Sequence, residues 1–159
     1  MIRVQRCAER SRGVALTEFA LVFPLLFVLF IGTLDFGRVF YNAMAVTHGA
    51  RAGVQYGAQN DTTSGDFDGM RQAALDASGD VSGVTVTACR FCQCADGTPS
   101  TCGCGTDTCN LACLTACSST DAPRVYVQVT VAKTFTPLFP YPGLPGATDV
   151  SRQATMRVQ

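Results

Sequence analysis

The feature that most constrains this chain is an apolar run of 21 residues near its N-terminus. Residues 14–34 contain a single ionisable side chain, Glu18, and residues 19–34 contain none. A helix rises about 1.5 Å per residue, so this run spans roughly 31 Å, which matches the hydrocarbon core of a bilayer. We therefore expect a helix that crosses the membrane once.

The charges around the run predict its orientation. Residues 1–13 hold four arginines against one glutamate, whereas the rest of the chain holds three more acidic than basic side chains. By the positive-inside rule, the basic end stays in the cytoplasm. Phe36, Phe40 and Tyr41 follow the run and suit an aromatic belt at the outer surface. The acidic remainder gives no support for a nucleic-acid partner.

A cleaved secretory signal is the alternative to a membrane anchor. The apolar region of such a signal is about 7–15 residues long, shorter than this run. The small-x-small cleavage candidate, residues 43–45, begins nine residues beyond the run and follows two charged residues. The sequence therefore favours the anchor.

The cysteines are distributed as an oxidising outer compartment predicts. Of nine cysteines, Cys7 precedes the apolar run and the other eight follow it. We expect these eight to form disulfides. The candidates are Cys89, Cys92, Cys94, Cys102, Cys104, Cys109, Cys113 and Cys117. A zinc–thiolate site is the alternative, but a second Cys-x2-Cys pair at a regular distance is missing, so we expect no metal and no other cofactor.

The remaining patterns predict an α+β fold. A long N-terminal transmembrane helix is followed by a short helix and a small antiparallel sheet of about three strands, with a disulfide-rich loop. Polar residues 60–65 break the long helix, and residues 66–77 form the short one, with Ser64 or Asp66 as N-cap and Gly79 as its stop. The strands are expected at residues 84–87, 125–132 and 155–159, and the proline-rich residues 135–146 form a rigid connection.

These assignments divide the chain into four parts. We expect a cytoplasmic leader at residues 1–13, a transmembrane helix at 14–34 and an extramembrane continuation of that helix at 35–58. Residues 59–159 form an extracytoplasmic α+β domain with a Cys-rich insertion at 89–117.

Small residues recur every four positions along the outer part of the long helix, at Ala45, Gly49, Gly53 and Gly57. A glycine inside a helix costs up to about 1 kcal/mol relative to alanine. Small residues at this spacing let a second backbone approach closely, so we expect helix packing here, and the partner can be the protein's own sheet. The alternative is an exposed helix that tolerates the glycines or frays near Gly57.

Three residues mark the start of the apolar run: Gly13, Val14 and Glu18. If the chain were cut after Gly13, the new amino group of Val14 would lie one helical turn from Glu18. In a stack of helices, the amine of one subunit can pair with Glu18 of its neighbour and fix their register. The alternative is that Glu18 reaches the cytoplasmic face of the membrane and has no partner.

These residues resemble the class III signal of type IV pilins and pseudopilins, in which a prepilin peptidase cuts after the glycine. The order EFALVFPLL from Glu18, followed by Gly32 and Asp35, is similar to that of TadE-like pseudopilins of Flp (tight adherence) pilus systems. GARAG at residues 49–53 and ATMRV at 154–158 also resemble that family. The resemblance is specific over residues 12–58, moderate over 120–159 and weak between.

The resemblance implies a minor pseudopilin that takes part in pilus assembly. Gly13 and Val14 would flank the cleavage site, Val14 would be N-methylated, and Glu18 would be the acidic position of the signal. The implied partners are a prepilin peptidase, other pilins and pseudopilins, the inner-membrane assembly platform and the lipid bilayer. The implied location is the bacterial cytoplasmic membrane, with the C-terminal domain outside, and the alternative is incorporation in a surface pilus.

Enzymatic function has little support in the sequence. The single histidine, His48, has no nearby nucleophile and base, and no phosphate-binding or dinucleotide motif occurs. Asp66 and Asp68 open the predicted short helix, where carboxylates favour the helix dipole. We expect that the protein is not an enzyme.

The alternative to a pseudopilin is an uncleaved single-span anchor that presents a Cys-rich domain to a ligand or metal.

We predict that the eight cysteines beyond the apolar run carry neither free thiols nor a metal, because an oxidising compartment favours disulfides. A thiol reagent should modify Cys7 at most in the unreduced protein, and metal analysis should find no zinc. Thiols that react only after a bound metal is removed would support the zinc site instead.

Overall fold

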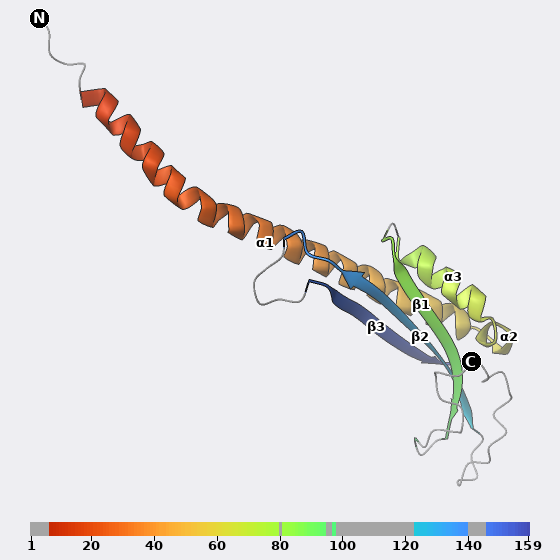
Figure 1. Ribbon diagram of the computed structural model, residues 1–159. Coiled ribbons are helices and arrows are strands. Elements are labelled where there is room, and N and C mark those ends of the chain that lie inside the picture. The colour runs from red at the N-terminus through yellow and green to blue at the C-terminus, as the bar shows by residue number, and fades with distance from the viewer. Residues whose placement is uncertain (1–6, 80, 95–96, 98–122, 140–145) are drawn as a thin grey trace, which may run out of the picture. The chain divides into compact units, whose positions relative to one another are not determined.

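The computed structural model of the chain has the predicted α+β fold, with one long apolar helix, a short helix and a three-stranded antiparallel sheet (Figure 1). It describes residues 7–79, 81–94, 97, 123–139 and 146–159, with the backbone alone for 7–12. The chain divides into two compact units, Met1–Arg38 and Val39–Gln159. The predicted fold class is confirmed.

Helix α1 spans Cys7–Gly57, which is 51 residues. It begins seven residues before the predicted start at Val14, inside the basic leader. Alanine, arginine and glutamate are good helix formers and dominate this part of the leader, so nothing there stops the helix. Pro24 lies within α1 and does not end it.

A capped turn and a second helix follow α1. The long helix ends at Gly57, so the break predicted at residues 60–65 is confirmed, and a short helix, α2, forms within that stretch at Asp61–Ser64. Asn60 caps it: its side chain accepts from the Thr63 amide at 2.9 Å, and the Thr63 hydroxyl accepts from the Asn60 amide at 3.2 Å. Such reciprocal bonds satisfy two amides that a helix start leaves unpaired.

Helix α3 spans Phe67–Ala77 and has the boundaries that its caps predict. Asp66 is the N-cap, and Ser64 belongs to α2 instead. Gly79 follows the C-cap residue Ser78 with φ of +64°, a left-handed conformation that ends helices and favours glycine.

The sheet has the order β1-β2-β3, and all neighbouring strands are antiparallel. Its strands are β1 at Val84–Gln93, β2 at Arg124–Phe135 and β3 at Thr148–Arg157. All three are longer than predicted, and β3 begins seven residues early and ends before Val158. β1 continues into the cysteine cluster, because pairing with β2 satisfies its backbone groups whatever its side chains are.

One core holds the second unit together. Alternate valines of β2 point toward α1 and α3, so both helices pack on the same face of the sheet. Met70 of α3 and Val46 of α1 are fully buried at this interface. The buried cluster consists of Val46, Ala50, Val54, Ala58, Met70, Ala74, Val127, Val129 and Val131.

The glycines of α1 lie against α3 and β2. A methyl group on Gly49 would stand 2.8 Å from the Ala74 carbonyl oxygen and would also collide with Ser78 Oγ. One on Gly53 would stand 3.0 Å from both the Met70 carbonyl oxygen and a methyl of Val129. A methyl group on Gly57 would collide with the sulfur of Met70. The small-residue spacing therefore coincides with the closest approach of α1 to the rest of the domain.

We predict that Gly49→Ala lowers the free energy of unfolding by about 1–2 kcal/mol, because overpacking costs about 1–3 kcal/mol and the gain in helix propensity is at most about 1 kcal/mol. Thermal unfolding of the full-length protein in detergent would measure it. Gly37→Ala is the matched control, since a methyl there meets no atom within 4 Å. Equal melting temperatures for the two variants would contradict the prediction.

Candidate functional site

The first unit presents an almost entirely exposed apolar surface. Leu16 is 72% exposed, Leu21 81% and Phe30 62%. By length and composition, α1 is the one helix among the described residues that can cross a membrane. An apolar surface of this length requires lipid or other helices to cover it.

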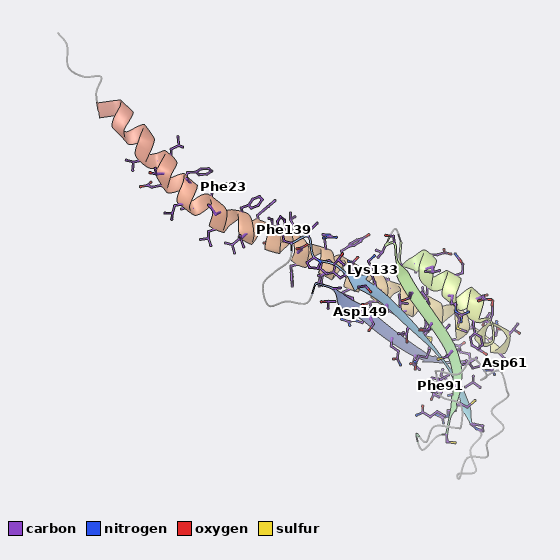
Figure 2. The ribbon with its side chains drawn as sticks, in the orientation of Figure 1. Phe23, Asp61, Phe91, Lys133, Phe139 and Asp149 are labelled. Carbon is purple, nitrogen blue, oxygen red and sulfur yellow. The ribbon has the colours of Figure 1, made fainter. Side chains whose placement is uncertain are left out.

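The two threonine hydroxyls within this surface are satisfied by the helix itself. The Thr17 hydroxyl donates to the Val14 carbonyl and the Thr33 hydroxyl to the Leu29 carbonyl, both at 2.8 Å. Phe23 lies between two other phenylalanines along α1, with ring centres 5.5 Å and 5.9 Å away (Figure 2). The segment thus offers lipid or another helix few unsatisfied groups.

Gly13, Val14 and Glu18 lie within the first turns of this surface. A methyl on Gly13 would meet no atom within 4 Å, so packing among the described residues does not require glycine there. Val14 is 57% exposed. Glu18 is exposed, lies one turn further along the helix and has no salt bridge to any described residue. Its carboxylate is therefore open to a cation from another molecule.

An ion pair follows the end of the apolar run. Arg38 Nη1 lies 3.2 Å from Asp35 Oδ1, three residues apart on α1. Asp35 is only 6% exposed, so its charge needs this partner. Beyond the pair, Phe40 and Tyr41 are exposed, as residues of an interfacial aromatic belt are.

In the second unit, a polar contact fastens the start of α3 to α1. The Tyr56 hydroxyl donates to Asp66 Oδ2 at 2.7 Å, and the Gly69 amide donates to Asp66 Oδ1 at 2.9 Å. The Gly69 bond, and then the Tyr56 bond, hold the pKa of Asp66 below its usual value. This contact stabilises the fold at pH values above the pKa of an aspartate in the unfolded chain, which is about 3.9. The stabilisation is lost as the pH falls through the lower pKa that Asp66 has in the folded protein.

A second contact joins α2 to β1. Arg90 Nη2 lies 2.6 Å from Asp61 Oδ1. Sequence reasoning missed Arg90 and Tyr56, because each contact joins residues that no local pattern relates. The Asn60 cap did have a signal, since Asn before Asp-Thr-Thr is a common helix start.

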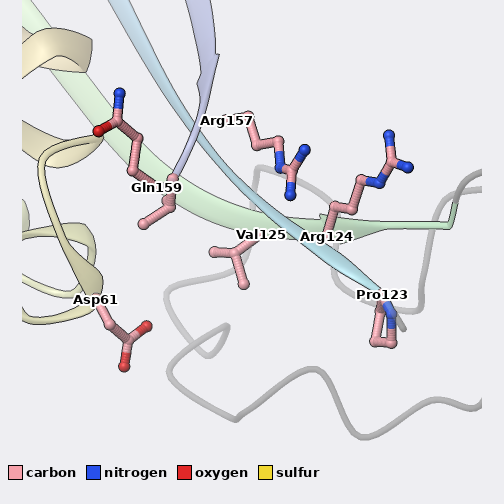
Figure 3. Close-up of a pocket in the computed structure, with 7 residues that line it drawn as sticks. Asp61, Pro123, Arg124, Val125, Arg157 and Gln159 are labelled. Carbon is pink, nitrogen blue, oxygen red and sulfur yellow. The ribbon is translucent and has the colours of Figure 1, made fainter. Parts of the chain in front are cut away.

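A pocket of about 330 Å³ lies beside this second contact, at one end of the sheet (Figure 3). Arg124 and Arg157 place guanidinium groups at its rim, and Asp61 contributes a carboxylate that Arg90 already binds. Its lining consists of Asp61, Pro123, Arg124, Val125, Arg157, Val158 and Gln159.

The cysteine candidates are described only in part. Cys89, Cys92 and Cys94 are disulfide-bonded, and Cys92 and Cys94 are buried. The other five candidates lie outside the described residues: Cys102, Cys104, Cys109, Cys113 and Cys117. The disulfide-rich loop and its pairing therefore stay predictions.

The residues considered for catalysis lie on different helices, with His48 on α1 and both aspartates at the start of α3. His48 is exposed on α1, and Asp68 is exposed in the first turn of α3 beside Arg71, at 2.8 Å. Asp66 serves as the α3 cap. Each carboxylate thus has a local structural partner.

Comparison with known proteins gives one similarity. Residues 13–55 match the sequence model of the family described as TadE-like protein. Neither the curated proteins nor the solved structures gave a match. The match begins at Gly13, covers the exposed apolar surface and continues into the part of α1 that enters the core. The resemblance to TadE-like proteins is thereby confirmed over residues 13–55, and this helix is apolar and long enough to anchor the chain by one pass through a membrane.

Proposed function

We propose that the chain is a minor pseudopilin that takes part in assembly of a Flp or type IV-like pilus. A prepilin peptidase in the bacterial cytoplasmic membrane cuts between Gly13 and Val14, and the domain at residues 59–159 lies outside that membrane. The observation that carries the proposal is that Gly13 and Glu18 frame the start of an exposed apolar helix, and that the TadE-like match begins at the same glycine.

The isolated carboxylate of Glu18 supports this function. A charge on a membrane helix costs up to roughly 2.5–3.5 kcal/mol at the bilayer centre and less near the interface. Cleavage creates an amino group on Val14, one turn away on the same face. Between adjacent copies or related pilins, this amine and Glu18 form an ion pair, which specifies axial register more surely than it adds stability.

Gly13 supports the same function by exclusion. Glycine disfavours a helix by about 1 kcal/mol, and its lack of a side chain relieves no crowding among the described residues. Packing among the described residues therefore gives no reason for glycine at position 13. A peptidase that binds the backbone closely in its active site does give one.

The role we propose is contact rather than catalysis. The described pocket is lined by arginine, aspartate, proline, valine and glutamine side chains, and none of these is a histidine, cysteine or serine. His48 lies on the exposed face of α1. The exposed helix surface, by contrast, is suited to association with lipid and with other helices.

We predict that the mature protein in membranes begins at Val14. N-terminal sequencing or intact mass of the membrane-extracted protein would measure it, and Gly13→Leu should leave the leader attached because the bulkier side chain blocks cleavage. An uncleaved single-span anchor that presents its domain to a ligand or metal is the competing function. It requires Met1 to persist in cells with an active prepilin peptidase.

Glu18 should matter for assembly and not for cleavage or folding. Glu18→Gln keeps the size of the side chain, removes its charge and should abolish pilus assembly in the native host while the protein is still processed. Glu9→Gln is the matched control, because it removes a carboxylate from the part of the chain that cleavage discards. Normal pilus assembly by Glu18→Gln would contradict the proposed pairing.

A further inference from the structure

The exposed apolar side chains of the second unit gather in two short segments. Among the described residues of this unit, seven large apolar side chains are exposed, and Leu75 and Met156 stand singly on α3 and β3. The other five lie where α1 enters the unit and just after the end of β2. We call these five the entry cluster: Phe40, Tyr41, Met44, Leu138 and Phe139.

The direction of β2 brings the two segments of the entry cluster to the same end of the unit. A methyl group on Gly53 would stand 3.0 Å from a methyl of Val129, so these two residues lie side by side. At the other end of the strand, the amides of residues 158–159 donate to the Val125 carbonyl at 2.9 Å and to the Ala58 carbonyl at 3.3 Å. β2 therefore runs antiparallel to α1 and ends toward the residues where α1 enters the unit.

The last residue of β2 reaches the level of Phe40. The six residues from Val129 to Phe135 cover roughly 20 Å of strand. The same length of helix is about 13 residues, which leads from Gly53 back to Phe40. Phe135 is 7% exposed and lies on the same face of β2 as the buried valines, so the strand stays packed against the helices up to its end.

The segment after β2 leaves the sheet. Pro137 has no amide hydrogen and cannot continue a strand ladder. The two residues that follow it are open to solvent, with Leu138 56% exposed and Phe139 50% exposed. Figure 2 shows Phe139 at the end of the sheet opposite Asp61. This end of the unit thus exposes apolar side chains from both α1 and the segment after β2.

The entry cluster begins close to the membrane surface. With residues 14–34 in the hydrocarbon core, Phe40 follows the core by six residues of one continuous helix, roughly 9 Å. The headgroup region beyond the core is about 5–8 Å deep on each side of a bilayer. A bend of α1 between the two units shortens this distance and cannot lengthen it. Phe40 is therefore at the outer edge of the headgroups.

The charges near the entry cluster limit how deeply it can insert. Lys133 precedes the end of β2 by two residues, roughly 7 Å of strand. The Thr134 hydroxyl donates to Asp149 Oδ1 at 2.7 Å, which places a carboxylate at the same level. Ionised groups are costly in hydrocarbon, whereas aromatic side chains favour the headgroup level. The chemistry of this end fits the interface of a bilayer and not its core.

We propose that Leu138 and Phe139 insert into the headgroup–acyl boundary of the bilayer that α1 crosses. Together with Phe40 and Tyr41, they hold the domain against the outer surface of the membrane. The partner is the lipid surface itself, because the cluster is continuous with the membrane-crossing helix. The proposal goes beyond the proposed function. It requires α1 to span a bilayer, but it requires neither cleavage after Gly13 nor contact with other pilins.

A tryptophan reporter tests the contact, because the chain contains no tryptophan of its own. In full-length Phe139→Trp in vesicles of phosphatidylethanolamine and phosphatidylglycerol, lipids brominated near the top of the acyl chain should quench the fluorescence. Acrylamide in the water should quench it at least about threefold less than in Met156→Trp. Met156 is the matched control, because it is 41% exposed and pairs with Val127 toward the other end of β2.

A charge beside the reporter should remove it from the lipid. Leu138→Asp, added to Phe139→Trp, should abolish quenching by brominated lipid and raise acrylamide quenching to that of the control. Leu75→Asp changes an exposed leucine of α3 and should alter neither signal. The uncleavable Gly13→Leu protein should give the same quenching as the processed one, which separates this test from that of the proposed function.

Four outcomes would overturn the proposal. Acrylamide quenching of Phe139→Trp equal to that of Met156→Trp would show that water surrounds the reporter. Protection from acrylamide without quenching by brominated lipid would show that protein covers it instead. Unchanged quenching after Leu138→Asp, or loss of lipid quenching in the Gly13→Leu protein, would also contradict it.

Discussion

The close approach of α1 to α3 is the contact on which the folded domain depends. Three glycines, Gly49, Gly53 and Gly57, remove the side chains that would hold the two helices apart. The Ala74 and Met70 carbonyls and the Val129 methyls then reach the α1 backbone, and Val46, Ala50 and Val54 complete the core between them. Because protein interiors are packed as densely as organic crystals, a single added methyl group is felt here.

One helix therefore serves two environments. In residues 14–34 the apolar side chains of α1 point outward in all directions, as they do in a helix surrounded by lipid or by other helices. In residues 45–57 only one side of α1 is buried, and it is lined with small residues and valines that fit α3 and β2. The TadE-like match covers the first segment and reaches residue 55 in the second, so the resemblance extends from the apolar part of α1 into the part that packs in the core.

The described carboxylates differ in whether the chain itself engages them. Glu18 is exposed on an apolar surface and has no salt bridge to a described residue. By contrast, Asp66, Asp61 and Asp35 are engaged within the chain by Tyr56, Arg90 and Arg38. The proposed function uses Glu18 in assembly, whereas Asp66 positions α3 and Asp61 holds α2 to β1.

The sequence by itself determined the features that depend on local periodicity. The apolar run, the Asp66 cap, the Gly79 stop and the alternating valines of β2 are each visible within a few residues, because helix and strand geometry repeat over that distance. Only the tertiary structure decided the rest. It extended β1 through Cys89 and Cys92 by pairing them with β2, and it placed Met70 against the glycines of α1. It also brought Arg90 to Asp61. These features join residues far apart in the chain, and their positions follow from how the elements share one core rather than from any local pattern.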